Sequence, residues 1–205
     1  MMVMNLNLRL QHTKEAGMQK AAGAQKQSVN HTSPLSVKDI AIIGMMTAIL
    51  VTVQVAISFL PNIELITLLL IVFTLVFRWK ALFVVFAFIL VEGLIYGFGL
   101  WWFSWIYIWP LLCVFTMLFR KIRSIFFWAI ASCVFGLAFG ALTAFPLLAI
   151  SGLKAAIAYW IQGIPFDLVH GISNLFLVLM LYYPLYFVMN KIYRQFYSNE
   201  RKLLP

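Results

Sequence analysis

The chain has 205 residues, of which 64% are hydrophobic and only 10% are charged, and its formal net charge is +9 at pH 7. Soluble domains are about 45–50% apolar and about 25% charged, so the composition excludes a water-soluble globular protein. The basic residues separate apolar runs instead of forming one patch, which argues against a nucleic-acid partner. Because the apolar runs are long and do not alternate, the sequence predicts an all-α integral membrane protein and not a β-barrel.

Residues 1–34 differ from the rest of the chain. They combine Gln, Asn, Ser and Ala with scattered basic residues and contain no long apolar run. Such a composition cannot bury enough apolar surface to fold. We therefore expect a flexible basic tail over residues 1–34, a membrane domain over 35–195 and a short cytoplasmic tail over 196–205.

Six apolar segments follow the tail, and we predict that each is a transmembrane helix. The second segment is short for a membrane span and needs protein neighbours or local thinning of the bilayer. The last two are long, and Pro146 and Pro165 are expected to break or kink them. In chain order, the six segments cover residues 40–60, 63–77, 81–98, 102–119, 125–150 and 164–189.

The distribution of basic residues predicts the orientation of the chain in the membrane. Basic residues precede the first segment, join the second to the third and the fourth to the fifth, and follow the sixth. With six spans, all of these fall on one side of the membrane, and Lys154 alone falls on the other. Cytoplasmic connections carry the excess of Lys and Arg, so we expect both termini in the cytoplasm.

Few polar side chains lie in the apolar segments, where each costs free energy unless it is paired. Asp167, His170 and Asn174 are three and four residues apart, so they share one face of a helix. Glu92 and Tyr96 form a similar pair. Interhelical hydrogen bonds would explain both sets of polar residues, and so would contacts with a bound ligand. The other polar residues of this kind are Asn62, Glu64 and Gln162.

Aromatic side chains gather near the predicted outward connections. An aromatic belt at the membrane surface would explain them. Alternatively, some of them cover a ligand, since rings supply a large contact area at little entropic cost. The residues concerned are Trp101, Trp102, Trp105, Tyr107, Tyr159 and Trp160.

Small side chains line one face of the first segment. A smooth face of this kind lets helices approach closely in lipid, either within the bundle or with a partner protein. The residues that form this face are Ala41, Gly44, Ala48 and Thr52.

Two stretches of the chain resemble a family of transporter subunits. Residues 44–48 read Gly-Met-Met-Thr-Ala, and residues 160–174 read Trp-Ile-Gln-Gly-Ile-Pro-Phe-Asp-Leu-Val-His-Gly-Ile-Ser-Asn. Together with the size and the predicted six-helix topology, they make residues 36–195 similar to the substrate-binding S components of energy-coupling factor (ECF) vitamin transporters. In that family an Ala-x-x-x-Ala pattern on the first helix contacts the coupling subunit. This chain has Gly44 at the first position of the pattern.

The resemblance implies a bacterial plasma-membrane protein that captures a vitamin or related micronutrient from outside. It also implies docking of the small face on a transmembrane coupling subunit, with two ATPase subunits supplying the energy of uptake. The protein itself would be no enzyme. The aromatic residues favour a ring-bearing ligand such as a cobalamin or a flavin. The expected ligand contacts are Asn62, Glu92, Tyr96, Trp101, Trp105, Tyr159, Trp160, Gln162, Asp167, His170 and Asn174.

Two other functions, those of an intramembrane enzyme and of a secondary carrier, are alternatives to vitamin capture. His170 and Asn174 form a His-x-x-x-Asn step that resembles a fragment of the CAAX-processing membrane proteases, with Glu92 as a general base. The paired glutamates and the further membrane histidine of those proteases are missing here. A stand-alone secondary carrier would favour internal repeats, and the two halves show none. The chain also has no phosphate-binding loop and no HExxH sequence, so no catalytic residue, metal site or cofactor is predicted.

Overall fold

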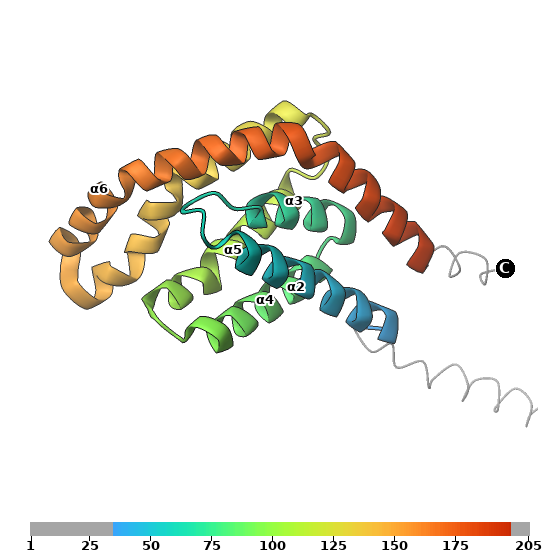
Figure 1. Ribbon diagram of the computed structural model, residues 1–205, viewed down its shortest axis with the longest axis horizontal. Helices are drawn as coiled ribbons and strands as arrows, with labels where there is room; N and C mark the ends of the chain where they lie inside the picture. The colour runs from blue at the N-terminus through green and yellow to red at the C-terminus, as the bar shows by residue number, and fades with distance from the viewer. Residues whose placement is uncertain (1–34, 198–205) are drawn as a thin grey trace, which may run out of the picture. The chain divides into compact units, whose positions relative to one another are not determined.

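A computed structural model describes residues 35–197, and over this range the chain is helical, without strands. The helices are α2 (Val37–Ile57), α3 (Ile66–Phe77), α4 (Lys80–Tyr96), α5 (Leu100–Leu118) and α6 (Ile125–Tyr197) (Figure 1). Three of them, α2, α5 and α6, are long and apolar enough to cross a membrane. The prediction of an all-α membrane protein is confirmed in this form. The predicted tail over residues 1–34 and the last eight residues lie outside the described residues.

Helix α6 consists of two arms that fold back on each other (Figure 1). Gly152 separates them, with φ 80° and ψ 175°, a left-handed conformation that residues with a Cβ rarely adopt. Pro146 and Pro165 were expected to break or kink the last two segments; neither breaks its helix, because both lie inside helical arms, and a kink at either stays a prediction. The predicted connection over residues 151–163 is also helical apart from Gly152.

The two arms of α6 approach closely where glycines face each other. A Cβ placed on Gly136 would lie 2.8 Å from the Cα and the backbone nitrogen of Gly171. A Cβ placed on Gly171 would lie 2.9 Å from the carbonyl oxygen of Cys133. Real Cβ atoms essentially never approach backbone this closely, so any side chain at either position would force the two arms apart. Small residues at such crossings are the usual means by which membrane helices pack tightly.

Helix α3 is the centre of the described bundle. Eleven of its 12 residues are buried, and it packs against α4, α5 and α6. Its length is about 18 Å at 1.5 Å per residue, which is much less than the ~30 Å of a bilayer core. The helix begins at Ile66 and not at residue 63 as predicted, because residues 58–65 form a loop. The short helix therefore leaves space at its ends, inside a shell of longer helices.

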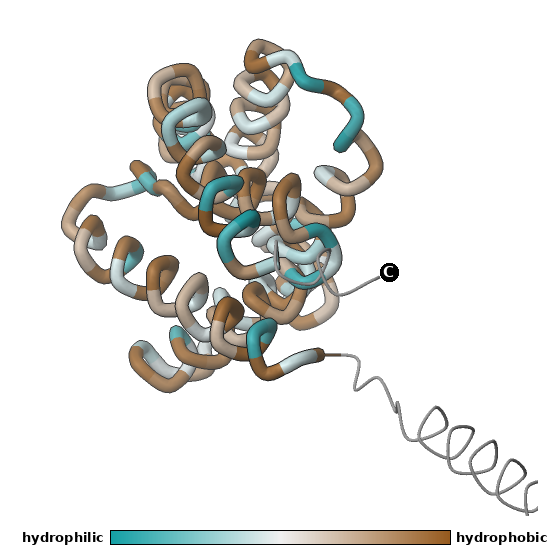
Figure 2. Tube along the Cα trace, turned by 90° about the vertical axis from the view of Figure 1, so that its right-hand side faces the viewer, coloured by the Kyte–Doolittle hydropathy of each residue, from teal (hydrophilic) through white to brown (hydrophobic). Residues whose placement is uncertain are grey.

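The surface of the bundle is apolar, as expected of a protein that faces lipid. Hydrophobic residues occur all along the helices (Figure 2). The buried core gathers large side chains from several helices, including Met46, Phe73, Phe88 and Trp128. Large hydrophobic side chains are also exposed along α5 and α6, among them Leu118, Phe126, Met180 and Phe187. Helices that are hydrophobic all round belong in a membrane or in a deep core.

One polar cluster joins three helices at the beginning of α2. The ammonium group of Lys80, in α4, forms an ion pair with Asp39 of α2 and donates a hydrogen bond to the Tyr197 hydroxyl of α6 at 3.0 Å. The Tyr197 hydroxyl donates a hydrogen bond to Asp39. Lys80 Nζ also lies 4.4 Å from the centre of the Tyr197 ring. The first and last described helices are thus connected through α4.

Candidate ligand-binding site

A cavity of about 430 Å³ lies at the N-terminal end of α3, beside the loop over residues 58–65. This volume falls within the range of about 300–1,000 Å³ that small-molecule sites occupy. The cavity is walled by five parts of the chain: the end of α2, this loop, α4, α5 and α6. Its lining residues are Gln54, Ile57, Ser58, Leu60, Pro61, Asn62, Ile63, Glu64, Glu92, Tyr96, Trp101, Trp105, Trp109, Phe139 and His170.

Three tryptophans of α5 form the aromatic wall of the cavity. Trp101, Trp105 and Trp109 are four residues apart and so follow one face of the helix. Their rings contact in sequence, with centroid separations of 4.9 Å for Trp101–Trp105 and 5.6 Å for Trp105–Trp109. Phe88 of α4 stacks on Trp105 from behind, at 5.6 Å and an interplanar angle of 17°. The wall is thus held in place by ring contacts, which suits it to receive a flat, ring-bearing molecule.

Two buried polar atoms in the cavity wall have no hydrogen-bond partner within residues 35–197. They are Oε1 of Glu92 and the indole Nε1 of Trp109. Both residues are nearly inaccessible, with exposed fractions of 1% and 2%. Leaving such an atom unpaired costs about 1–3 kcal/mol, so native proteins usually satisfy it. Both residues line the cavity, but the two atoms are covered, so a ligand could pair with them only after the side chains that cover them move.

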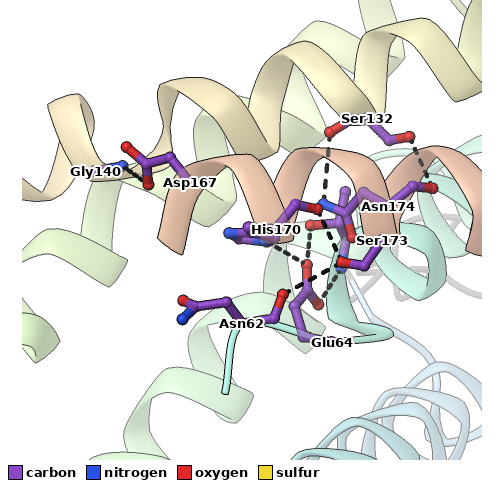
Figure 3. A network of polar contacts seen from close by, with 9 residues as sticks. Asn62, Glu64, Ser132, Gly140, Asp167, His170, Ser173 and Asn174 are labelled. Atoms are coloured by element: carbon purple, nitrogen blue, oxygen red, sulfur yellow. Dashed lines mark hydrogen bonds and ion pairs between the residues drawn. The ribbon is translucent and has the colours of Figure 1, made fainter. Parts of the chain in front are cut away.

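An ionisable pair connects the loop beside the cavity to α6. His170 Nε2 lies 3.0 Å from Glu64 Oε1 (Figure 3). Glu64 also accepts a hydrogen bond from the Thr67 backbone N–H at 2.8 Å and another from the Thr67 hydroxyl. The backbone bond satisfies one of the free N–H groups at the start of α3. The Ser173 hydroxyl donates to the carbonyl oxygen of Asn62 at 3.3 Å, which adds a second connection to the loop.

Asp167 and Asn174 lie between the two arms of α6 and do not line the cavity (Figure 3). The Gly140 backbone N–H donates a hydrogen bond to Asp167 Oδ1 at 2.9 Å. The Ser132 hydroxyl lies 3.4 Å from the carbonyl oxygen of Asn174, and the Asn174 amide lies 3.5 Å from the carbonyl oxygen of Ser132. The polar stripe predicted on the last segment therefore divides, with His170 at the cavity and its two neighbours in the helix interface.

The structure brings some of the predicted ligand contacts together and separates others. The cavity lining includes Asn62, Glu92, Tyr96, Trp101, Trp105 and His170. Exposed positions of α6 outside the lining carry Tyr159, Trp160 and Gln162. Sequence reasoning did not place Gln54, Glu64, Trp109 or Phe139 at the site. The four-residue spacing of the α5 tryptophans was the signal for Trp109, and Glu64 was recognised only as a polar residue within an apolar segment.

No family model, curated protein or solved structure matches the chain. Within the described range, no three His, Cys, Asp or Glu residues are grouped so that they could hold a metal ion. The cavity lining combines hydrogen-bonding side chains with aromatic rings.

The small residues of α2 form an exposed face. Gly44 has no atom within 4 Å of the position that a Cβ would take, and Ala41, Ala48 and Thr52 are all exposed. The opposite side of α2 packs into the core through Ile42, Met46 and Leu50, which are at most 2% exposed. The described part of the chain thus does not use the small face for its own packing.

Proposed function

We propose that this protein is a membrane-embedded capture subunit of the ECF vitamin-transporter type. The observation that carries the proposal is the tryptophan-walled cavity, whose lining residues Glu92 and Trp109 each keep an unpaired buried polar atom. Six crossings are proposed, with α6 supplying two, and both termini are placed in the cytoplasm by the positive-inside rule. In this orientation the cavity belongs to the outer half of the membrane, where a micronutrient arrives.

The cavity favours a ring-bearing ligand of flavin size over a cobalamin. A volume of about 430 Å³ suits one fused-ring molecule and is small for a corrin with its attached nucleotide. The rings of Trp101 and Trp105, which meet edge to face, supply aromatic contact area for such a ligand. Glu92 and Trp109 select a molecule that carries a hydrogen-bond donor on one side and an acceptor on the other. Rejection of close analogues would follow, because a molecule without these groups leaves the two atoms unpaired.

The exposed small face of α2 is the proposed docking surface for the coupling subunit. A transmembrane partner can approach a helix closely where Gly and Ala replace larger side chains. Ala41, Gly44 and Ala48 present such a surface along successive turns. Two ATPase subunits would supply the hydrolysis of ATP, which the sequence of this chain does not provide.

Replacing Glu92 with leucine tests the capture function most directly. We expect Glu92→Leu to weaken ligand binding more than tenfold, because a buried hydrogen bond to a charged group is worth about 1.5–3 kcal/mol. The melting temperature should stay the same or rise, since a buried unpaired acid is replaced with an apolar side chain of similar size. Riboflavin and a cobalamin are titrated separately into the detergent-solubilised protein, and the melting temperature is recorded in their absence.

Two tryptophan variants provide the matched comparison for this experiment. Trp109→Phe removes the unpaired N–H of the cavity and should weaken binding, whereas Trp160→Phe makes the same change on an exposed side chain outside it. Native mass spectrometry of the wild type should also show a retained vitamin-sized molecule. Clean preparations that carry none, together with no binding across a panel of vitamins, would overturn the capture function.

Docking is tested by a bulky substitution on α2. Gly44→Leu should abolish co-purification with a co-expressed ECF coupling subunit and its ATPases, because leucine prevents close helix approach. Ligand binding by the isolated subunit should be unchanged, since the space around Gly44 is open. Gly163→Leu is the control, because that glycine also has nothing within 4 Å of its Cβ position. If Gly44→Leu assembles as well as the wild type, α2 is not the docking surface.

A further inference from the structure

A second and larger hollow lies at the other end of α3. Its volume is about 1190 Å³, and Leu75 near the end of α3 contributes to its wall. The rest of the wall comes from the connection between α5 and α6 and from the last part of α6, residues 182–195. We call this hollow the basic groove, because its wall includes Arg120, Arg123, Lys191 and Arg194.

Within residues 35–197, no acidic side chain balances the charges of the basic groove. No aspartate or glutamate of this range lines it. Among residues 35–197, none of the four basic side chains forms an ion pair; Asp39 pairs with Lys80 there, and Glu64 lies against His170. Four like charges around one hollow repel one another and attract an anion. Arg guanidinium groups in particular bind phosphate through two parallel hydrogen bonds.

Aromatic side chains extend the groove onto the apolar surface. Tyr182 and Tyr186 stack at 5.7 Å with an interplanar angle of 9°. Their neighbours in the wall, Tyr183 and Phe187, are 58% and 71% exposed. A soluble anion would use only the basic part of this site. A lipid would use both parts, with its headgroup among the basic residues and its acyl chains along Tyr183 and Phe187.

We propose that the basic groove binds the phosphate headgroup of an anionic membrane lipid such as phosphatidylglycerol. Basic pockets between membrane helices on the positively charged side bind headgroups of this class. The tyrosines suit the level of the headgroups, where their rings are amphipathic anchors. The site is separate from the tryptophan-walled cavity, with which it shares no lining residue, and the proposal does not depend on the ECF assignment.

The test measures lipid retention by the full-length protein. The protein is exchanged into detergent with equal amounts of phosphatidylglycerol and phosphatidylcholine, and bound lipids are counted by native mass spectrometry. The wild type should retain phosphatidylglycerol in preference. Arg120→Gln/Arg123→Gln and Lys191→Gln/Arg194→Gln should each weaken this retention about tenfold or more, because each basic residue near a membrane surface contributes about 1 kcal/mol. The control Arg78→Gln/Lys121→Gln removes two charges outside the groove and should retain the lipid.

Three outcomes would overturn the proposal. Equal retention of the two lipids by the wild type would show that the groove does not select an anionic headgroup. This outcome is measured on the wild type alone, so it does not depend on whether the variants fold. Equal loss in the control variant would show a general effect of net charge. Displacement of phosphatidylglycerol by millimolar inorganic phosphate, which lacks acyl chains, would assign the groove to a free anion. Resistance to phosphate together with loss in both groove variants supports the lipid.

Discussion

Gly136→Leu is expected to prevent the two arms of α6 from packing and so to abolish the native fold. The Cβ alone would lie 2.8 Å from the backbone of Gly171, and backbone atoms cannot move aside as a flexible side chain can. Overpacking costs about 1–3 kcal/mol even in adaptable cores, and here the arms must separate. Separation would also break the bond between Gly140 and Asp167. The measurements are the elution profile in detergent and the melting temperature.

The matched control is Gly163→Leu, which introduces the same side chain in the same helix. Nothing lies within 4 Å of the Cβ position of Gly163, so this variant should elute and melt like the wild type. Gly136→Ala tests the same contact with a smaller side chain and should lower the melting temperature without abolishing the fold. A Gly136→Leu protein that melts like Gly163→Leu would contradict the close approach of the two arms.

His170→Leu is expected to destabilise the protein and to weaken ligand binding together. Removing one partner of a buried hydrogen-bonded pair costs about 1–3 kcal/mol, because the other partner remains buried without compensation. Here Glu64 would keep its bonds to Thr67, and the loop over residues 58–65 would lose one of its two connections to α6. That loop forms part of the cavity wall, so binding depends on it. Chemical stability and ligand affinity are measured on the same preparations.

A double-mutant cycle separates the interaction of Glu64 with His170 from the other effects of each substitution on stability. If Glu64 and His170 act mainly on each other, Glu64→Gln/His170→Leu should cost much less than the sum of the two single changes. Ser173→Ala is the control on the same turn of α6. It removes hydroxyl bonds to the Asn62 and His170 carbonyl oxygens, and a typical hydrogen bond contributes only about 0.5–1.5 kcal/mol. Additive single costs in the cycle would contradict the pairing.

The positions of most helices could be predicted from the sequence, because charged or turn-forming residues bound the apolar runs. The segment predicted over residues 81–98 corresponds to α4, which begins at Lys80 and ends at Tyr96. The region between residues 151 and 163 was harder. Its glycines and Lys154 are typical of a loop, but its alanines favour helix, and most of its side chains are exposed, so no buried face marks it as a helix. Only Gly152 departs from helical geometry.

The candidate site was predictable only where its residues lie on one helix. Trp101 and Trp105 could be predicted to face the same way because their spacing matches the helical repeat. The pairing of Glu64 with His170 joins positions 106 residues apart, and a single sequence contains no signal for such a contact. Asp167 and His170 share a helical face within about 60°, yet one bonds to the neighbouring arm and the other borders the cavity. The helical repeat predicts which residues share a face of a helix, but it does not predict which other segments pack against that face.

The enclosure of α3 has a consequence for biosynthesis. The chain emerges from the ribosome from its N-terminus, so α3 is made before α4, α5 and α6, all of which pack around it. Before α4, α5 and α6 have been made, they cannot cover α3, which is then left facing lipid. Helix α3 is about 18 Å long, so it is too short to span a bilayer core of ~30 Å. The last described residue of α6, Tyr197, joins Lys80 and Asp39. The contact that joins the first and last described helices can therefore form only after the whole of α6 has been made.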